Sequence, residues 1–443
     1  MPSKIRHPIE LLHPESLKHL SSKLQYLVKS KLWAKVIFAM FVGLLIGLIL
    51  NPSSGFFQKD FALIIGEWLA LPGTIFLALI QMIVLPLIFA SIIRGIAASE
   101  NIESLKKNGL FVGVYFVLTT LFAILLGLFL VYLIQPGSFI TMAALPDASL
   151  IIVPVEELSI NFSNIPTMIS QIIPTNIFSS FLNLQFFQIV IFSLIFGVAL
   201  VNMDVKQSKP LIDLLGALQS VCITIVQWAM LIVPFAVFGF IARATIQLGF
   251  DILFGMSFYL LTVILGLFLL IIMNVVIVFF VTKHNPISFL KKIKDVLLLA
   301  FSTSSSAVVM PLSMKTIEEK FGVRSSIANF VIPMGVTMNM NGTALYQAVA
   351  IVFLAQVFGI TLALPTLILI ILTVVASSIG APGTPGVGIV ILSAILVSAG
   401  IPLIGIALIL GFDRILDMLR TTVNVTGDIS AAVILEKMTK KEE

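Results

Sequence analysis

Long apolar stretches separated by short polar connections dominate the chain from residue 32 onward. A helix needs about 20 apolar residues to cross the hydrocarbon core of a bilayer, because backbone polar groups that face lipid must be paired within the segment. This pattern predicts an all-α polytopic membrane protein. The stretches that predict its transmembrane helices are 32–50, 68–96, 108–134, 181–202, 211–247, 252–282, 325–358 and 401–434.

Two further apolar segments, 287–314 and 362–398, are interrupted near their middle by small residues and proline. The interruptions run from Ser302 to Pro311 and from Ser377 to Gly388. Each interruption favours a re-entrant hairpin that enters and leaves the membrane on the same side. Small residues that let helices pack closely are the alternative interpretation.

Basic residues in the connections support the hairpins. Lysine and arginine are concentrated in the connections 97–107, 203–210, 283–295 and 315–324, whereas 136–180 contains neither. Because basic connections stay inside, this pattern predicts that 1–31 is a cytoplasmic arm and that the C-terminus is also cytoplasmic. The alternation holds only if both interrupted segments are hairpins, which predicts eight transmembrane helices plus two re-entrant helical hairpins in inverted repeat. Such repeats place a binding site near the bilayer midplane.

The composition excludes several other classes of protein. Of the 443 residues, 59% are hydrophobic and 11% are charged, which argues against a soluble enzyme and against a nucleic-acid-binding domain. The single cysteine, Cys222, excludes a disulfide framework. The four histidines lie in polar segments, so they predict no zinc site within the membrane.

The last apolar stretch carries a row of charges. Asp413, Asp417, Arg420, Asn424 and Asp428 follow one another at steps of four or three residues, which places them on one face of a helix. Each charge at bilayer depth costs about 2.5–3.5 kcal/mol on the insertion scale, so the row predicts a functional site. A purely structural ladder of ion pairs is the alternative.

Three other polar tracts lie in apolar surroundings. The tract 337–343 contains two asparagines, two threonines and a glycine; unwinding there frees carbonyl oxygens for a small cation, and a simple kink is the alternative. The hairpin tips, 302–306 and 378–388, are rich in small residues, and short helices that meet there aim N–H groups at an anion. Thr119 and Thr120 offer hydroxyl groups, although such pairs also serve helix packing.

Together, these tracts resemble the dicarboxylate/amino acid:cation symporter family, whose best-known members are glutamate transporters. The resemblance rests on the serine-rich tip, on Asn339-Met340-Asn341-Gly342-Thr343, on the second tip and on the pattern from Asp413 to Asp428. It implies a homotrimer in the cell membrane, in which a transport unit moves like an elevator against a static scaffold. Residues 32–250 would be mainly scaffold, with 108–134 in the transport unit; 251–438 would form the transport core, and 439–443 a cytoplasmic tail.

The resemblance also implies roles for single residues in substrate binding. Arg420 would pair with the side-chain carboxylate of the substrate, and Asp417 would bind its amino group. The second tip would close over the substrate as the outer gate. The other implied substrate-binding residues are Thr421, Asn424, Thr343, Ser305, Ser306, Thr384 and Gly388.

Three cation sites are implied in the same way. One joins Asp428 to carbonyl groups of Gly335, Asn339 and Asn424, and a second uses carbonyl groups of Thr337, Ser378, Ile379 and Ala381. A third uses Thr119, Thr120 and Asn339 with residue 341, where many members have aspartate and this chain has Asn341. An amide oxygen supplies no negative charge, which leaves the third sodium site and the coupling ratio open.

The leading hypothesis is a symporter that imports glutamate or aspartate with Na⁺ and has no organic cofactor. An arginine binds a carboxylate through two parallel hydrogen bonds, and an aspartate balances an ammonium group. The alternative is an H⁺-coupled glutamate/aspartate or C4-dicarboxylate symporter. Arg414, beside Asp413, is a hypothetical source of the charge that some relatives carry on the first tip. A hypothesis of another class, an intramembrane hydrolase using Ser305 or the pair Asp413/Asp417, lacks a histidine base.

Overall fold

The computed structural model describes residues 32–97, 110–140, 173–183, 185–248 and 251–439. The predicted cytoplasmic arm at 1–31 lies outside the described residues, as do most of the connections 97–107 and 136–180 and the end of the predicted tail.

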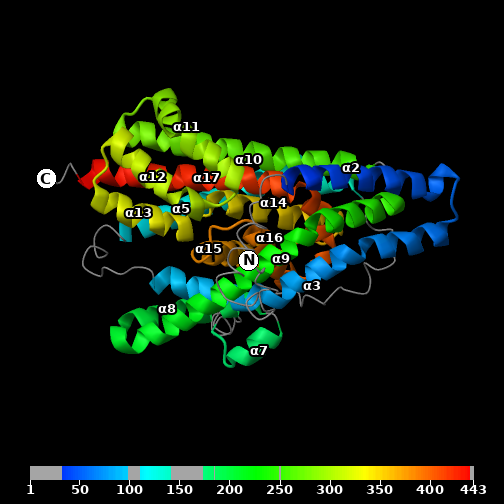
Figure 1. Cartoon of the computed structure of the whole chain (residues 1–443), viewed down its shortest axis with the longest axis horizontal. Coiled ribbons are helices and arrows are strands. Elements are labelled where there is room, and N and C mark those ends of the chain that lie inside the picture. Colours follow the sequence, from blue (N-terminus) through cyan, green and yellow to red (C-terminus); the bar gives the residue numbers. More distant parts are fainter. Residues whose placement is uncertain (1–31, 98–109, 141–172, 184, 249–250, 440–443) are drawn as a thin grey trace, which may run out of the picture.

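Every regular element in the described ranges is a helix, which confirms the all-helical prediction for this part of the chain. Figure 1 shows long helices that lie roughly along one direction. The elements are α2 (Leu32–Leu50), η2 (Pro52–Ser54), α3 (Lys59–Ala97), α5 (Leu110–Ile134), η4 (Pro136–Phe139), α7 (Ile177–Leu182), α8 (Phe186–Asn202), α9 (Val205–Leu248), α10 (Asp251–Thr282), α11 (Pro286–Thr303), α12 (Ser306–Phe321), α13 (Ser325–Met338), α14 (Asn341–Val357), α15 (Leu364–Ser378), α16 (Val387–Ser398), η7 (Leu403–Gly405) and α17 (Ile406–Thr439).

Several helices have the length and composition of membrane spans. Five stretches in the described residues are long and apolar enough: Lys59–Ile96, Phe111–Phe139, Val205–Gln247, Gly255–Thr282 and Ser325–Val357. Large apolar side chains such as Trp68, Phe235 and Phe280 remain exposed on these helices, as expected of surfaces that face lipid. The architecture fits a multi-pass membrane protein.

Each predicted apolar stretch contains a helix, but several helix ends differ from the prediction. The helix α3 begins at Lys59 rather than near 68, and α9 begins at Val205 rather than near 211. Hydropathy marks the part of a helix that lies in hydrocarbon, whereas the helix itself continues into polar sequence. The helix α17 begins at Ile406, later than the predicted 401, because a 3₁₀ turn follows Pro402.

The interrupted segments form helix pairs, and the polar tract in the seventh stretch forms a break. Helices α11 and α12 pack against each other and are joined by Ser304 and Ser305, so the chain reverses there. Helices α15 and α16 also pack against each other and are joined by residues 379–386. Between α13 and α14 the helix stops at Asn339 and Met340 and then resumes, which agrees with the predicted irregularity.

Helix α17 lies at the centre of the C-terminal half and packs against α10, α11, α12, α13 and α14. Almost every residue of α14 is buried, and α5 packs along it. Helices α2, α3, α8 and α9 pack mainly with one another. The polar face of α17 is therefore enclosed by helices and by the loop between α15 and α16.

Candidate functional site

Charged side chains of α17 meet inside the protein. Arg420 is 1% exposed, and its Nη2 lies 2.8 Å from Asp417 Oδ1 and 3.1 Å from Asp413 Oδ1. The ring of Tyr346, on α14, covers the guanidinium with its centroid 3.9 Å from Cζ. Two carboxylates and an aromatic face thus compensate the buried cation.

The Asp417 carboxylate has other partners besides Arg420. Its Oδ2 lies 3.7 Å from Nη1 of Arg414, one turn earlier on α17. The same oxygen accepts a hydrogen bond of 3.4 Å from the backbone N–H of Gly386, in the loop between α15 and α16. Arg414 therefore reaches Asp417, and the second tip contacts the charged row directly.

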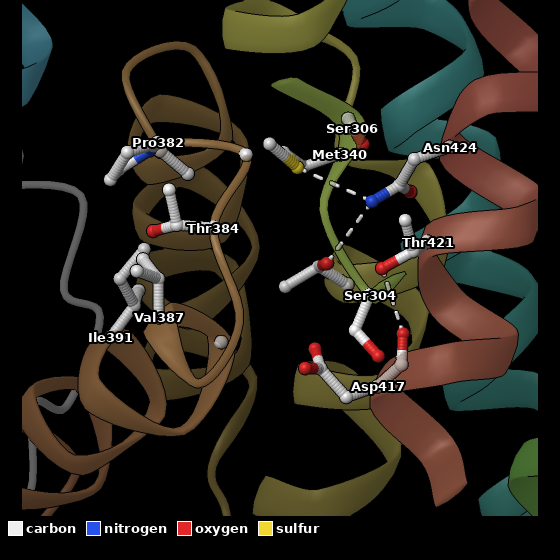
Figure 2. A pocket seen from close by; sticks show the side chains of 14 residues that line it. Ser304, Ser306, Met340, Pro382, Thr384, Val387, Ile391, Asp417, Thr421 and Asn424 are labelled. Atoms are coloured by element: carbon white, nitrogen blue, oxygen red, sulfur yellow. Dashed lines mark hydrogen bonds between the residues drawn. The ribbon is translucent and has the colours of Figure 1, made fainter. Parts of the chain in front are cut away.

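A small polar pocket lies between α17 and the second tip. Figure 2 shows Asp417, Thr421 and Asn424 on one side and Thr384 with apolar tip residues on the other. The cavity volume is ≈ 20 Å³, room for about one water molecule. The lining residues are Ser304, Ser306, Met340, Thr343, Ala381, Pro382, Gly383, Thr384, Val387, Gly388, Ile391, Asp417, Thr421 and Asn424.

The pocket brings together most of the residues that the sequence indicated for substrate binding: Asp417, Thr421, Asn424, Thr343, Ser306, Thr384 and Gly388. Arg420 is not among the lining residues and lies behind Gly388, where an added Cβ would stand 3.2 Å from Arg420 Nη1. Ser305 does not line the pocket either. It caps α12 and donates a hydrogen bond of 2.8 Å to the Gly383 carbonyl on the second tip.

Sequence reasoning missed several residues at this site, among them Ser304, Met340 and Tyr346. Ser304 lines the pocket with a hydroxyl that has no hydrogen-bond partner in the described part of the chain, and Met340 lines it beside Asn424. Tyr346 covers Arg420. A tyrosine in an apolar helix normally indicates core packing, although its position three residues after Thr343, on the same helix face, was an available signal.

The first predicted cation set is assembled around Asp428. Asn339 Nδ2 donates hydrogen bonds to Asp428 Oδ1 at 2.7 Å and to the Asn424 carbonyl at 2.9 Å. Gly335 lies so close that an added Cβ would stand 2.4 Å from Asp428 Oδ1. Asp428 and the Asn424 carbonyl thus lie around one amide group, and a carboxylate with a carbonyl oxygen is the kind of hard-ligand pair that a small cation binds.

The second predicted set comes from two elements. Thr337 lies near the end of α13, whereas Ser378, Ile379 and Ala381 follow one another where α15 ends. The hydroxyls of Thr337 and Ser378 donate to carbonyls of their own helices, at Met334 and Val375, which leaves the backbone carbonyls as the candidate ligands.

The third predicted set is incomplete as a cation site. Thr120 donates a hydrogen bond of 2.7 Å to Asn341 Oδ1, while Asn341 Nδ2 is buried without a partner among the described residues. Thr119 donates to the carbonyls of Tyr115 and Phe116 on its own helix. A buried amide donor and no carboxylate make this set a poor match to a cation.

The geometry of the described residues supports neither a metal-binding cluster of acidic side chains nor a hydrolytic centre. No group of three or more His, Cys, Asp or Glu residues in the described ranges is arranged to hold a metal ion. Asp413 and Asp417 share one arginine on the same helix, and Ser305 is bonded to a backbone carbonyl. This geometry gives the hydrolase hypothesis no nucleophile paired with a base.

The amino-acid sequence is similar to those of known transport proteins along most of its length. Residues 32–438 match the model of the sodium:dicarboxylate symporter family. A "Proton/glutamate-aspartate symporter" of Escherichia coli (strain K12) is 33% identical over 94% of this chain and 94% of its own length. A "Proton/sodium-glutamate symport protein" of Bacillus subtilis (strain 168) is 35% identical over 90% of this chain and 91% of its length.

The similarity extends to animal proteins. "Excitatory amino acid transporter 3" of Homo sapiens is 32% identical over 85% of this chain and 80% of its own length. The family consists of symporters and not of enzymes, which confirms the prediction that the protein is not an enzyme. The chain belongs to the sodium:dicarboxylate symporter family.

Proposed function

We propose that this protein imports glutamate or aspartate by secondary active symport with sodium ions. The observation that carries the proposal is the buried pair of Arg420 and Asp417 at the edge of a polar pocket. Its relatives are named as proton or sodium symporters of glutamate and aspartate. Import and the coupling to an ion gradient follow from membership of the family.

The two charges define the substrate. Arg420 matches a carboxylate, and Asp417 matches an ammonium group, so an acidic amino acid satisfies both. A C4-dicarboxylate would bring a second carboxylate against Asp417, which disfavours that alternative. The hydroxyls of Ser304 and Thr384 line the pocket without partners among the described residues and remain available to the substrate backbone.

The cavity volume of ≈ 20 Å³ is too small for an amino acid, so substrate entry requires the pocket to open. The loop of the second tip, residues 379–386 between α15 and α16, is the element that moves. It forms one wall of the pocket and contacts Asp417 through Gly386. Gly386 has φ 84°, a backbone conformation that glycine adopts without strain. The second tip therefore acts as the outer gate.

The full architecture has eight transmembrane helices and two re-entrant hairpins in inverted repeat, with both termini in the cytoplasm. The paired helices α11–α12 and α15–α16 support the hairpins. The scaffold comprises α2, α3, α8 and α9, and the transport core comprises 251–438 together with α5, which packs along α14. The assembly is a homotrimer in the cell membrane, and the core carries substrate across like an elevator.

Sodium is the proposed driving ion because of the oxygen ligands around Asp428. The second set of carbonyl ligands, at the ends of α13 and α15, supplies a further sodium site. The set at Asn341 does not form a sodium site. This protein therefore binds one sodium ion fewer than a family member with aspartate at that position. Proton coupling is the second candidate, because that amide removes a carboxylate and because relatives are named as proton symporters.

The experiment is uptake of labelled L-aspartate into proteoliposomes under an imposed sodium gradient, an imposed proton gradient, or both. We expect a sodium gradient to drive accumulation and its removal to abolish it. Equal uptake without external sodium would exclude sodium coupling. Accumulation of succinate in preference to aspartate would exclude the amino-acid assignment.

A further inference from the structure

Asp413 is a buried carboxylate that substrate binding, as proposed above, does not use. Its side chain is 6% exposed and lies one turn before Asp417 on α17. The Oδ1 atom is 3.1 Å from Arg420 Nη2 but has no well-aligned hydrogen-bond donor among the described residues. Arg420 is therefore the ion-pair partner of Asp413, and the Tyr346 hydroxyl is the hydrogen-bond donor beside it.

The surroundings of Asp413 contain few other charges. The titratable and charged groups that face it in the described residues are Arg414, Asp417 and Arg420 on α17, Tyr346 on α14 and Tyr259 on α10. Helices α2 and α9 present apolar side chains near Gly411: Met40, Val237 and Ile241. The two aspartates and two arginines cancel, so the cluster is neutral while all four are ionised.

The geometry of the guanidinium forces a competition for Arg420. A carboxylate can bind an arginine through two bonds either at Nε and Nη2 or at Nη1 and Nη2, so both arrangements need Nη2. Asp413 and Asp417 both lie against Nη2, whereas Nε and Nη1 have no partner in the described part of the chain. A substrate carboxylate that binds Arg420 in this way displaces an aspartate.

Loss of the ion pair with Arg420 leaves the two aspartates with different remaining partners. Asp417 keeps Arg414 and the N–H of Gly386, and it gains the ammonium group of the substrate. Asp413 keeps the hydroxyl group of Tyr346 and the longer-range charge of Arg414, whose ion-pair partner is Asp417, and it stands beside the negative charge of Asp417. An unpaired carboxylate in such surroundings is unstable, and taking up a proton removes its charge.

We propose that Asp413 is the proton-accepting residue of the transport cycle. When an acidic amino acid draws Arg420 toward the pocket, Asp413 takes one proton from the external solution. When the substrate leaves on the inner side, Arg420 returns and Asp413 releases the proton there. This role rests on the proposed function. It makes Asp413 the residue that carries the coupled proton, and it is compatible with sodium binding near Asp428.

The test measures proton uptake during substrate binding. The purified full-length protein is placed in weakly buffered solution with a pH indicator, and L-aspartate is added at saturating sodium. We expect about one proton to be taken up per substrate, and the affinity to rise by up to about tenfold per unit as pH falls from about 8 to about 6. The substrate itself keeps its charges over this range.

Variants locate the proton. Asp413→Asn, which cannot take up a proton, is expected to bind L-aspartate with an affinity that does not change with pH and to take up no proton. Asp413→Glu retains a carboxylate and is expected to restore both signals. The matched control is Asp295→Asn, which removes an exposed carboxylate paired with Lys320 on the surface and should behave as wild type.

The outcomes separate the two proposals. Substrate binding by the wild type without proton uptake, or proton uptake that persists in Asp413→Asn, would overturn the role of Asp413 and leave the proposed function standing. Absence of acidic amino-acid binding at every pH would overturn the proposed function itself. A loss of affinity in Asp413→Asn that is equal at all pH values, with proton uptake retained, would show a structural role only and would also overturn the proposal.

Discussion

Gly335 leaves room for the Asp428 carboxylate. The glycine has no Cβ, and an added one would stand 2.4 Å from Asp428 Oδ1. Asn339 holds the same oxygen through its amide, so the carboxylate has little freedom to move aside. The small size of Gly335 therefore leaves the space that the proposed cation site at Asp428 needs.

We expect Gly335→Ala to weaken sodium binding by about tenfold or more, because overpacking of a closed site costs about 1–3 kcal/mol. The measurement is the sodium concentration that half-saturates L-aspartate binding. Gly113→Ala is the matched control, since an added Cβ there has only Met334 Cε, at 3.9 Å, as a neighbour. Unchanged sodium dependence in Gly335→Ala would remove Asp428 from the proposed site.

The sequence predicted the members of the pocket better than their contacts. The spacing placed Asp417 and Asn424 on one helix face, the family resemblance added Thr421, and the structure brings the three together in one pocket. The spacing allowed an ion pair between Arg420 and an aspartate of the same row, but it could not show that Tyr346 covers Arg420, because that contact depends on another helix, α14. Residue spacing determines which side chains share a helix face, whereas tertiary packing determines which neighbouring residues each charged side chain contacts.

Among the elements, the second tip makes contacts on two sides. On one side, the Gly383 carbonyl accepts hydrogen bonds from the Ser305 hydroxyl at 2.8 Å and from the Ala307 N–H at 3.3 Å on the first hairpin. On the other side, Gly380 packs against the backbone of Ile92 on α3. The tip thus links the proposed transport core to the proposed scaffold, and its opening must break the contacts at Gly383.

Ser305→Ala removes one of the bonds that close the tip. A hydrogen bond contributes about 0.5–1.5 kcal/mol, so we expect substrate dissociation to accelerate roughly 2- to 10-fold. Ser302→Ala is the control, because that exposed serine bonds only to the Leu299 carbonyl of its own helix. Dissociation rates follow from the release of bound labelled aspartate, and identical rates in both variants would argue against the second tip as the gate.

Hydropathy predicted the position of each element more accurately than its ends. Lys59 and Asp60 lie inside α3, although they are polar, because a helix needs hydrogen bonds along its backbone and no apolar side chains once it leaves hydrocarbon. The hairpin tips were predicted from serine, glycine and proline. The bond between Ser305 and Gly383 was not, since it joins residues 78 positions apart.

The whole molecule has an orientation that the basic connections predict and that labelling can test. The only cysteine, Cys222, is buried and can be replaced by serine to give a cysteine-free background. In cells, a membrane-impermeant thiol reagent is expected to label Gln58→Cys, in an exposed connection predicted to be outside. Lys315→Cys, at an exposed position predicted to be cytoplasmic, should react only after the membrane is permeabilised. The reverse pattern would contradict the proposed topology and the inverted hairpins.

The central claim is that the buried charges of α17 bind an acidic amino acid, and it is tested most directly at Arg420. Uptake of labelled L-glutamate is measured in proteoliposomes that contain the wild type, Arg420→Met or the control Arg243→Met, which breaks an ion pair with Glu67 outside the pocket. Removing one partner of a buried charge pair costs about 2–5 kcal/mol. We expect uptake to fall by about a hundredfold or more in Arg420→Met and to persist in the control. Glutamate uptake at the wild-type affinity and rate in Arg420→Met would contradict the account.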